Sequence, residues 1–206
     1  MKIFQWVGIA VLAFGMGGTA ASAQQGPPPA SQAPPTITAV LNTELTIVER
    51  EVVGVAQEMP EDKYSFAPTN GEFKGVRTFA QQVKHLATVN DRVFDSILGL
   101  TAPVAPDEGI TSNGPDAIQT KEQILQYLKE SFARGHKAIA TINAENALTP
   151  IKGAAVPFLS TRAALAIFDC AHAMDHYGQM VEYLRDNGHI PPASQQRPPA
   201  NPQAKP

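Results

Sequence analysis

Four stretches of the chain carry apolar residues at steps of three and four, the spacing typical of amphipathic helices. Met59-Pro60 should end the first, because a helix rarely continues through the residue before a proline. No segment shows the alternation of a β-strand. The pattern therefore predicts an all-α fold, a four-helix bundle with long crossing loops. The predicted helices span about residues 38–58, 75–100, 120–146 and 161–187.

Several of these helices carry recognisable end signals. Thr120 is placed to cap the third helix, and Gln123 three residues later completes a capping box. Ser160 or Thr161 can cap the fourth helix, and Gly188 is placed to end it. The third helix contains Gly135, which should weaken it locally.

The loop over residues 60–74 joins the first two predicted helices and is rich in turn-forming residues. It also carries the aromatic residues Tyr64, Phe66 and Phe73. Aromatic side chains in such a loop usually pack across the core. We therefore expect this loop to cap the bundle, rather than to face a substrate.

The first 23 residues have the pattern of a secretory signal peptide. Lys2 precedes a short apolar run, and Ala21-Ser22-Ala23 fits the small-residue pattern of a cleavage site. The apolar run is short for a membrane span, and an uncleaved N-terminal anchor is the alternative. The sequence thus predicts an exported, periplasmic protein that leaves the membrane once the signal is removed.

The remaining chain divides by composition. Residues 24–36 are rich in Pro and Gln and predict a flexible linker, and residues 193–206 predict a disordered Pro-rich tail. The bundle domain is expected over residues 37–192, a length that can bury a real core.

Charge and cysteine content exclude some classes of function. Removing Lys2 with the signal leaves 15 Lys and Arg against 19 Asp and Glu, a net charge of −4. No basic run stands out, which argues against nucleic acid as a partner. Cys170 is the only cysteine, so an internal disulfide is excluded, and we expect its thiol to be buried rather than catalytic.

Two histidines on the last predicted helix are candidates for a metal site. His172 and His176 lie four residues apart, so their imidazoles share one helix face. Such a pair often arises by chance, and a third ligand would have to come from elsewhere. His85 is the best candidate, although it lies beside its helix's apolar stripe, where a lone His is usually a surface or boundary residue. His136 is a rival whose charged neighbours suggest a solvated face.

Three imidazoles with one open position would form the pattern of a catalytic metal site. Neutral imidazole suits zinc, nickel, copper and iron ions. Asp169 and Asp175 lie within one turn of His172, and either could orient an imidazole or simply face solvent. Gln179 could bond a ligand or substrate, or a neighbouring helix. The chain has no GxSxG elbow, Gly-rich phosphate loop, CxxC pair or HExxH motif.

Two blocks of sequence resemble a known family. Residues 59–90 read MPEDKYSFAPTNGEFKGVRTFAQQVKHLATVN, and residues 172–194 read HAMDHYGQMVEYLRDNGHIPPAS. In order and spacing they resemble the first and last conserved blocks of the DinB-like, or YfiT-like, damage-inducible proteins. The resemblance spans nearly the whole mature domain.

The resemblance implies a four-helix bundle in which His85, His172 and His176 together bind one divalent ion, zinc, nickel, iron or manganese. It also implies that Gly178 sits close to a neighbouring helix. Two positions depart from the family's common pattern. Asp175 stands where many members have a second His, and Tyr177 replaces a commoner Arg.

Some members of this family are thiol-dependent S-transferases, including ones that use mycothiol or bacillithiol, and others look like metal-dependent hydrolases. We therefore expect an exported hydrolase or thiol transferase of a small molecule, with Gln179, Asp175 or Tyr177 assisting. A non-catalytic metal- or ligand-binding bundle, or a bundle whose histidines hold nothing, is the alternative. Many members form homodimers through bundle faces, but the sequence identifies no such face.

Overall fold

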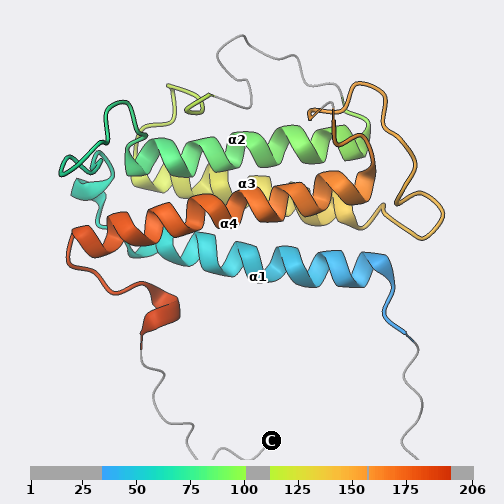
Figure 1. The fold of residues 1–206 in the computed structure, drawn as a ribbon, viewed down its shortest axis with the longest axis horizontal. Helices are drawn as coiled ribbons and strands as arrows, with labels where there is room; N and C mark the ends of the chain where they lie inside the picture. Colours follow the sequence, from blue (N-terminus) through green and yellow to red (C-terminus); the bar gives the residue numbers. More distant parts are fainter. Residues whose placement is uncertain (1–33, 101–111, 157, 196–206) are drawn as a thin grey trace, which may run out of the picture. The chain divides into compact units, whose positions relative to one another are not determined.

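A computed structural model describes residues 34–100, 112–156 and 158–195 of the chain. These residues fold into four α-helices and two short 3₁₀ turns, with no strand among them, which confirms the predicted all-α bundle (Figure 1). The predicted signal peptide, nearly all of the linker and most of the tail lie outside the described residues. The elements are α1 (Ile37–Glu58), η1 (Glu61–Lys63), α2 (Phe79–Leu98), α3 (Lys121–Ile139), α4 (Arg162–Asp186) and η2 (Pro192–Ser194).

Each helix packs mainly against two others, so that the order around the bundle is α1, α3, α2 and α4. The α2 and α3 helices run parallel. Thr88 bonds to Tyr127 and Asn90 bonds to Ser131, and the second pair lies further along both helices than the first. Parallel neighbours require a long crossover, and the connection from Gly99 to Thr120 supplies it.

The α4 helix runs antiparallel to α2, as Figure 1 shows. Gln82 near the start of α2 bonds to Gln179 near the end of α4, and the Tyr183 hydroxyl donates to the carbonyl of Arg77, before α2 begins. This antiparallel contact positions the histidines.

The α2 helix begins four residues later than the sequence predicted. Thr78 caps it, accepting a hydrogen bond from the backbone N–H of Gln81, whose side chain accepts one from the backbone N–H of Thr78. This capping box leaves Val76, which the predicted helix included, before the helix and 38% exposed. Gly99 ends the helix with a φ of 71°, a left-handed conformation that suits glycine.

The α3 helix ends at Ile139, and its predicted extension to residue 146 was wrong. Asn143 accepts hydrogen bonds from the backbone N–H groups of Glu145 and Asn146, and Asn146 donates to the carbonyl of Thr141. These side chains offer the backbone a turn in place of another helical turn. The Thr120–Gln123 capping box is confirmed, and of the two candidates Thr161 caps α4.

The loop after α1 packs on the core through two of its three aromatic residues. Tyr64 is buried, donates to the carbonyl of Ala56 at 2.6 Å, and meets the Phe79 ring edge-to-face. Phe66 packs edge-to-face on Tyr183 of α4. The prediction of a capping role is confirmed for both, whereas Phe73 is 40% exposed and lines a pocket described below.

Two helical glycines have opposite surroundings. A Cβ atom at Gly135 of α3 would lie 2.6 Å from the Phe94 ring and 2.9 Å from a Leu45 methyl group, so this glycine allows three helices to approach closely. A Cβ atom at Gly178 of α4 would meet nothing within 4 Å. The expectation that Gly178 lies against a neighbouring helix was therefore wrong.

These surroundings predict opposite effects of alanine. Gly178→Ala should stabilise the protein by about 0.5–1 kcal/mol, because alanine favours a helix. Gly135→Ala gains the same propensity but overpacks the core, so we expect a net loss of about 1–2 kcal/mol. Urea unfolding followed by circular dichroism measures both. Equal stabilisation by the two substitutions would contradict the close approach at Gly135.

Candidate metal centre

Three histidines from the two antiparallel helices α2 and α4 lie together. One ring nitrogen of each of His85, His172 and His176 lies within 4.8 Å of the others. The Nε2 atoms of His85 and His172 are 3.2 Å apart, and the His172 and His176 ring centroids are 4.6 Å apart. Two imidazoles bound to one ion about 2.1 Å away would hold their nitrogens a little over 3 Å apart. The spacing is therefore near that of a metal site.

His85 is buried, with 3% exposure, so its expected place at the surface or boundary was wrong. Residues 112–115 lie against this part of α2, and the apolar spacing along the helix does not reveal that contact. The Nδ1–H of His85 donates to the carbonyl of Ser112 at 2.7 Å, and Lys84 holds the same segment through the carbonyl of Pro115. Because a carbonyl only accepts, the proton of neutral His85 sits on Nδ1, and Nε2 presents its lone pair to the cluster.

His176 is oriented by a chain of hydrogen bonds that runs in one direction. Its Nδ1–H donates to Oε1 of Gln82 at 2.5 Å, and Nε2 of Gln82 donates to Oε1 of Gln179 at 2.8 Å. Nε2 of Gln179 in turn donates to Oδ2 of Asp175 at 3.1 Å. The chain ends on a carboxylate, which only accepts, so each amide has one orientation and Nε2 of His176 is left as a lone pair.

His172 differs from the other two, because its buried Nδ1 has no hydrogen-bond partner. Since Nε2 of His85 is an acceptor, the short contact between the two Nε2 atoms requires His172 to carry its proton on Nε2. The Phe168 ring stacks on this imidazole at 5.7 Å. An ion entering the cluster would therefore have to displace one proton, that of His172, from Nε2.

Burial keeps all three imidazoles neutral at pH 7. The pKa of His176 is lowered to about 3 and that of His172 to about 4, mainly by desolvation, which also lowers the pKa of His85. The other two imidazoles contribute to the lowered pKa of His176, and the positive charge of Arg77 acts on all three in the same direction. Neutral imidazoles with converging nitrogens are a donor set that fits a divalent ion.

A family model described as DinB superfamily matches residues 44–180, which include all three histidines. The chain belongs to the DinB superfamily. A search of curated proteins gave no match. Proteins of this superfamily bind metals, and the clustered histidines of this DinB protein could do so too.

The residues predicted to assist catalysis lie at unequal distances from the DinB histidine cluster. Gln179 is exposed and joins the cluster through Gln82. Asp175 bonds to Gln179 rather than to an imidazole. Tyr177 turns toward α1, where its hydroxyl donates to Glu51 at 3.3 Å.

The rival histidine, His136, lies on α3 outside the cluster. Its ring is half-buried against α1, with Nδ1 2.7 Å from Asn42 and Nε2 2.9 Å from Glu49. The Cys170 thiol is buried, as predicted, and burial raises its pKa to about 12, which makes it a poor nucleophile. Among the described residues, no helix is long and apolar enough to span a membrane.

Sequence reasoning missed Gln82 and Ser112, which hold the outer nitrogens of two histidines. Gln82 lies three residues before His85 on the same helix and is almost fully buried. A buried amide one turn from a candidate ligand is the signal that could have revealed it. Ser112 contributes only its backbone carbonyl, which no sequence pattern identifies.

Loss of the Gln82 side chain should weaken metal binding. Gln82→Leu removes the acceptor for Nδ1 of His176, and loss of such a partner typically costs 10–100-fold in metal affinity. Gln82→Glu keeps an acceptor and should retain most of the affinity. Calorimetric titration with Zn²⁺ measures both, with Gln126→Leu, on the exposed face of α3, as the control. An unchanged affinity in Gln82→Leu would show that the hydrogen bond does not support the site.

Asp169 does not orient His172. Its carboxyl group is fully buried on α4, and neither oxygen has a hydrogen-bond partner. Burial raises its pKa well above the ordinary value of 3.8, so the carboxyl group is protonated in the fold over a range in which the unfolded chain ionises.

This burial predicts a pH dependence of stability. Above about pH 4 the folded state binds one proton more than the unfolded chain, so Asp169 lowers stability as the pH rises, by up to about 1.4 kcal/mol per unit. Asp169→Asn should therefore gain stability over the natural protein at pH 8 but not at pH 4. Urea unfolding in EDTA at both pH values tests this, with the exposed Asp62→Asn as control. A gain of equal size at pH 4 and pH 8 would contradict it.

Proposed function

We propose that this DinB-superfamily protein is an exported metal-dependent enzyme, either a hydrolase or a thiol S-transferase, that acts on a small molecule. One observation carries the proposal: three neutral imidazoles converge in the bundle, and no carboxylate or thiol of the described residues joins them. Three protein ligands leave a position open, which is the arrangement of catalytic rather than structural sites.

Such an ion, when bound, lowers the pKa of a coordinated water or thiol toward neutrality. The role of the chain is to hold the ligands. The carbonyl of Ser112 and the amide of Gln82 fix the rings of His85 and His176, and the surrounding core keeps bulk water away. Because the cluster has no carboxylate, the site retains the full charge of its ion and attracts anionic groups.

Arg77 strengthens this preference for anions. Its positive charge lies near enough to lower the pKa of every histidine in the cluster, and its Nε donates to Asn113 at 3.0 Å, in the same segment that covers His85. A hydroxide, a thiolate or a substrate carboxylate would each be favoured here, which suits both hydrolysis and thiol transfer.

Among the residues predicted to assist, Gln179 is the one we retain for contact with substrate. It is exposed and reaches the cluster through a single intervening amide. Asp175 acts by holding Gln179. Tyr177 has no part in the proposal, because its hydroxyl is turned to Glu51 on α1.

Burial of His85 and His176 also favours a second function, that of a non-catalytic module in which the ion is structural or is sensed. The two functions differ in what metal removal does. A structural ion should contribute strongly to the melting temperature, whereas a catalytic ion can be lost with a smaller change and restored together with turnover.

Export is proposed from the pattern of residues 1–23. Expression with the native N-terminus, followed by fractionation and mass spectrometry of the mature chain, tests it. A mature protein that begins after Ala23 and lies in the periplasm is the expected result, and an intact N-terminus in the cytoplasm would overturn it.

Protein purified without a His-tag should carry about one divalent ion per chain. Alanine at His85, His172 or His176 should each reduce the metal content severalfold or more, while His136→Ala should not. Elemental analysis identifies the ion, and a screen of ester, amide and thiol substrates with that ion tests turnover. A metal-free protein that neither binds added ions nor gains thermal stability from them would refute the proposal.

A further inference from the structure

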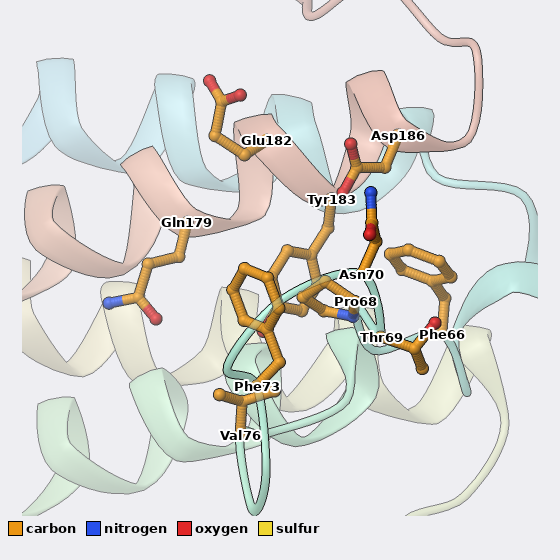
Figure 2. A pocket seen from close by; sticks show the side chains of 10 residues that line it. All are labelled: Phe66, Pro68, Thr69, Asn70, Phe73, Val76, Gln179, Glu182, Tyr183 and Asp186. Carbon is orange, nitrogen blue, oxygen red and sulfur yellow. The ribbon is translucent and has the colours of Figure 1, made fainter.

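A pocket of about 740 Å³ lies between the segment over residues 66–76 and the last turns of α4 (Figure 2). Gln179, Glu182, Tyr183 and Asp186 line it from α4, and the other residues named in the figure belong to the segment over residues 66–76. The same Gln179 bonds to Gln82, which bonds to His176. The pocket is therefore separated from a candidate metal ligand by two amide side chains.

One part of the pocket wall is apolar and aromatic. Phe66 and Tyr183 meet edge-to-face, with ring centroids 5.8 Å apart, and the Tyr183 hydroxyl is fixed on the carbonyl of Arg77. Phe73 and Val76 also line the pocket, although they are 40% and 38% exposed. Large apolar side chains exposed around one cavity are typical of a binding site for an apolar body.

The charged side chains that line the pocket are all acidic. Glu182 is paired with Arg185 at 2.9 Å, so its charge is largely balanced. The side-chain carboxylate of Asp186 has no ion-pair or hydrogen-bond partner among the described residues. Among the described residues no Lys, Arg or His lines the pocket, so its acidic side chains disfavour an anionic ligand.

Aromatic faces and a free carboxylate together are the chemistry that recognises an organic cation. We propose that this pocket binds a small molecule with an apolar or aromatic body and a protonated amine, with the amine beside Asp186 and the body against Phe66, Phe73 and Tyr183. This assignment rests on the proposed function and gives its substrate class: an amine-bearing compound whose reacting group extends past Gln179 toward the histidines.

Three probes that share a phenyl ring and a short chain test the charge preference: 2-phenylethylamine, 2-phenylethanol and 3-phenylpropionate. Titration of the full chain at pH 7, followed by ligand-observed NMR, gives a dissociation constant for each. We expect the amine to bind about five- to tenfold more tightly than the alcohol, and the carboxylate to bind most weakly. Equal affinities, or no binding of the amine in the millimolar range, would overturn the inference.

Two substitutions test the carboxylate and the aromatic wall of the pocket separately. Asp186→Asn should reduce the amine's affinity to that of the alcohol, while the exposed Asp62→Asn should change neither. Phe73→Ala should weaken the amine and the alcohol by a similar factor. Circular dichroism of each variant confirms that it is folded. An amine preference that survives Asp186→Asn would show that the cation is not recognised here.

The titrations are made on EDTA-treated and Zn²⁺-loaded protein. An amine preference present in both forms supports the pocket even if no turnover is ever found, so the inference can stand when the proposed function fails. An ion that binds to the histidines without any amine preference leaves the proposed function in place and removes this pocket as its substrate site.

Discussion

The antiparallel packing of α2 on α4 is the contact on which the candidate site depends. It brings His85 of one helix to His172 and His176 of the other, and it buries His85 and His176 and partly buries His172. Burial, with the neighbouring positive charges, keeps the imidazoles neutral, and each neutral ring must then place one N–H on an acceptor. The acceptors are Gln82 for His176, the carbonyl of Ser112 for His85 and Nε2 of His85 for His172, so the fold and the site share the same hydrogen bonds.

Contacts with α3 hold α2 in its position beside α4. On the side away from α4, Arg134 of α3 bonds to Asp91 and Asp95 of α2, both at 2.9 Å. Deeper in the same interface, Gly135 lets the Phe94 ring lie against the α3 backbone. Because α2 is held from both sides, His85 has little freedom to move, which reduces the entropy that metal binding would otherwise cost.

Much of this could be predicted from the sequence, because local rules govern it. The three- and four-residue spacing placed four helices, and the Thr120–Gln123 capping box gave the start of α3. The positions of His172 and His176 on one face also follow from helix geometry alone.

The rest depends on contacts between segments distant in sequence. The burial of His85 depends on the segment after α2, and the end of α3 depends on Asn143 and Asn146 bonding to nearby backbone. The space around Gly178 likewise depends on how this chain's own helices pack, which the family's sequence blocks do not determine.

The charges around Gln179 differ on its two sides. Toward the histidines there is, when a divalent ion is bound, the charge of that ion, which no carboxylate of the described residues offsets. Toward the pocket there is the free carboxylate of Asp186. A molecule with an anionic reacting group and a cationic far end would favour one orientation between the bound ion and Asp186. The reversed orientation would place like charges together at both ends. Orientation by charge would allow an open pocket to present one end of such a molecule to a bound ion without enclosing it.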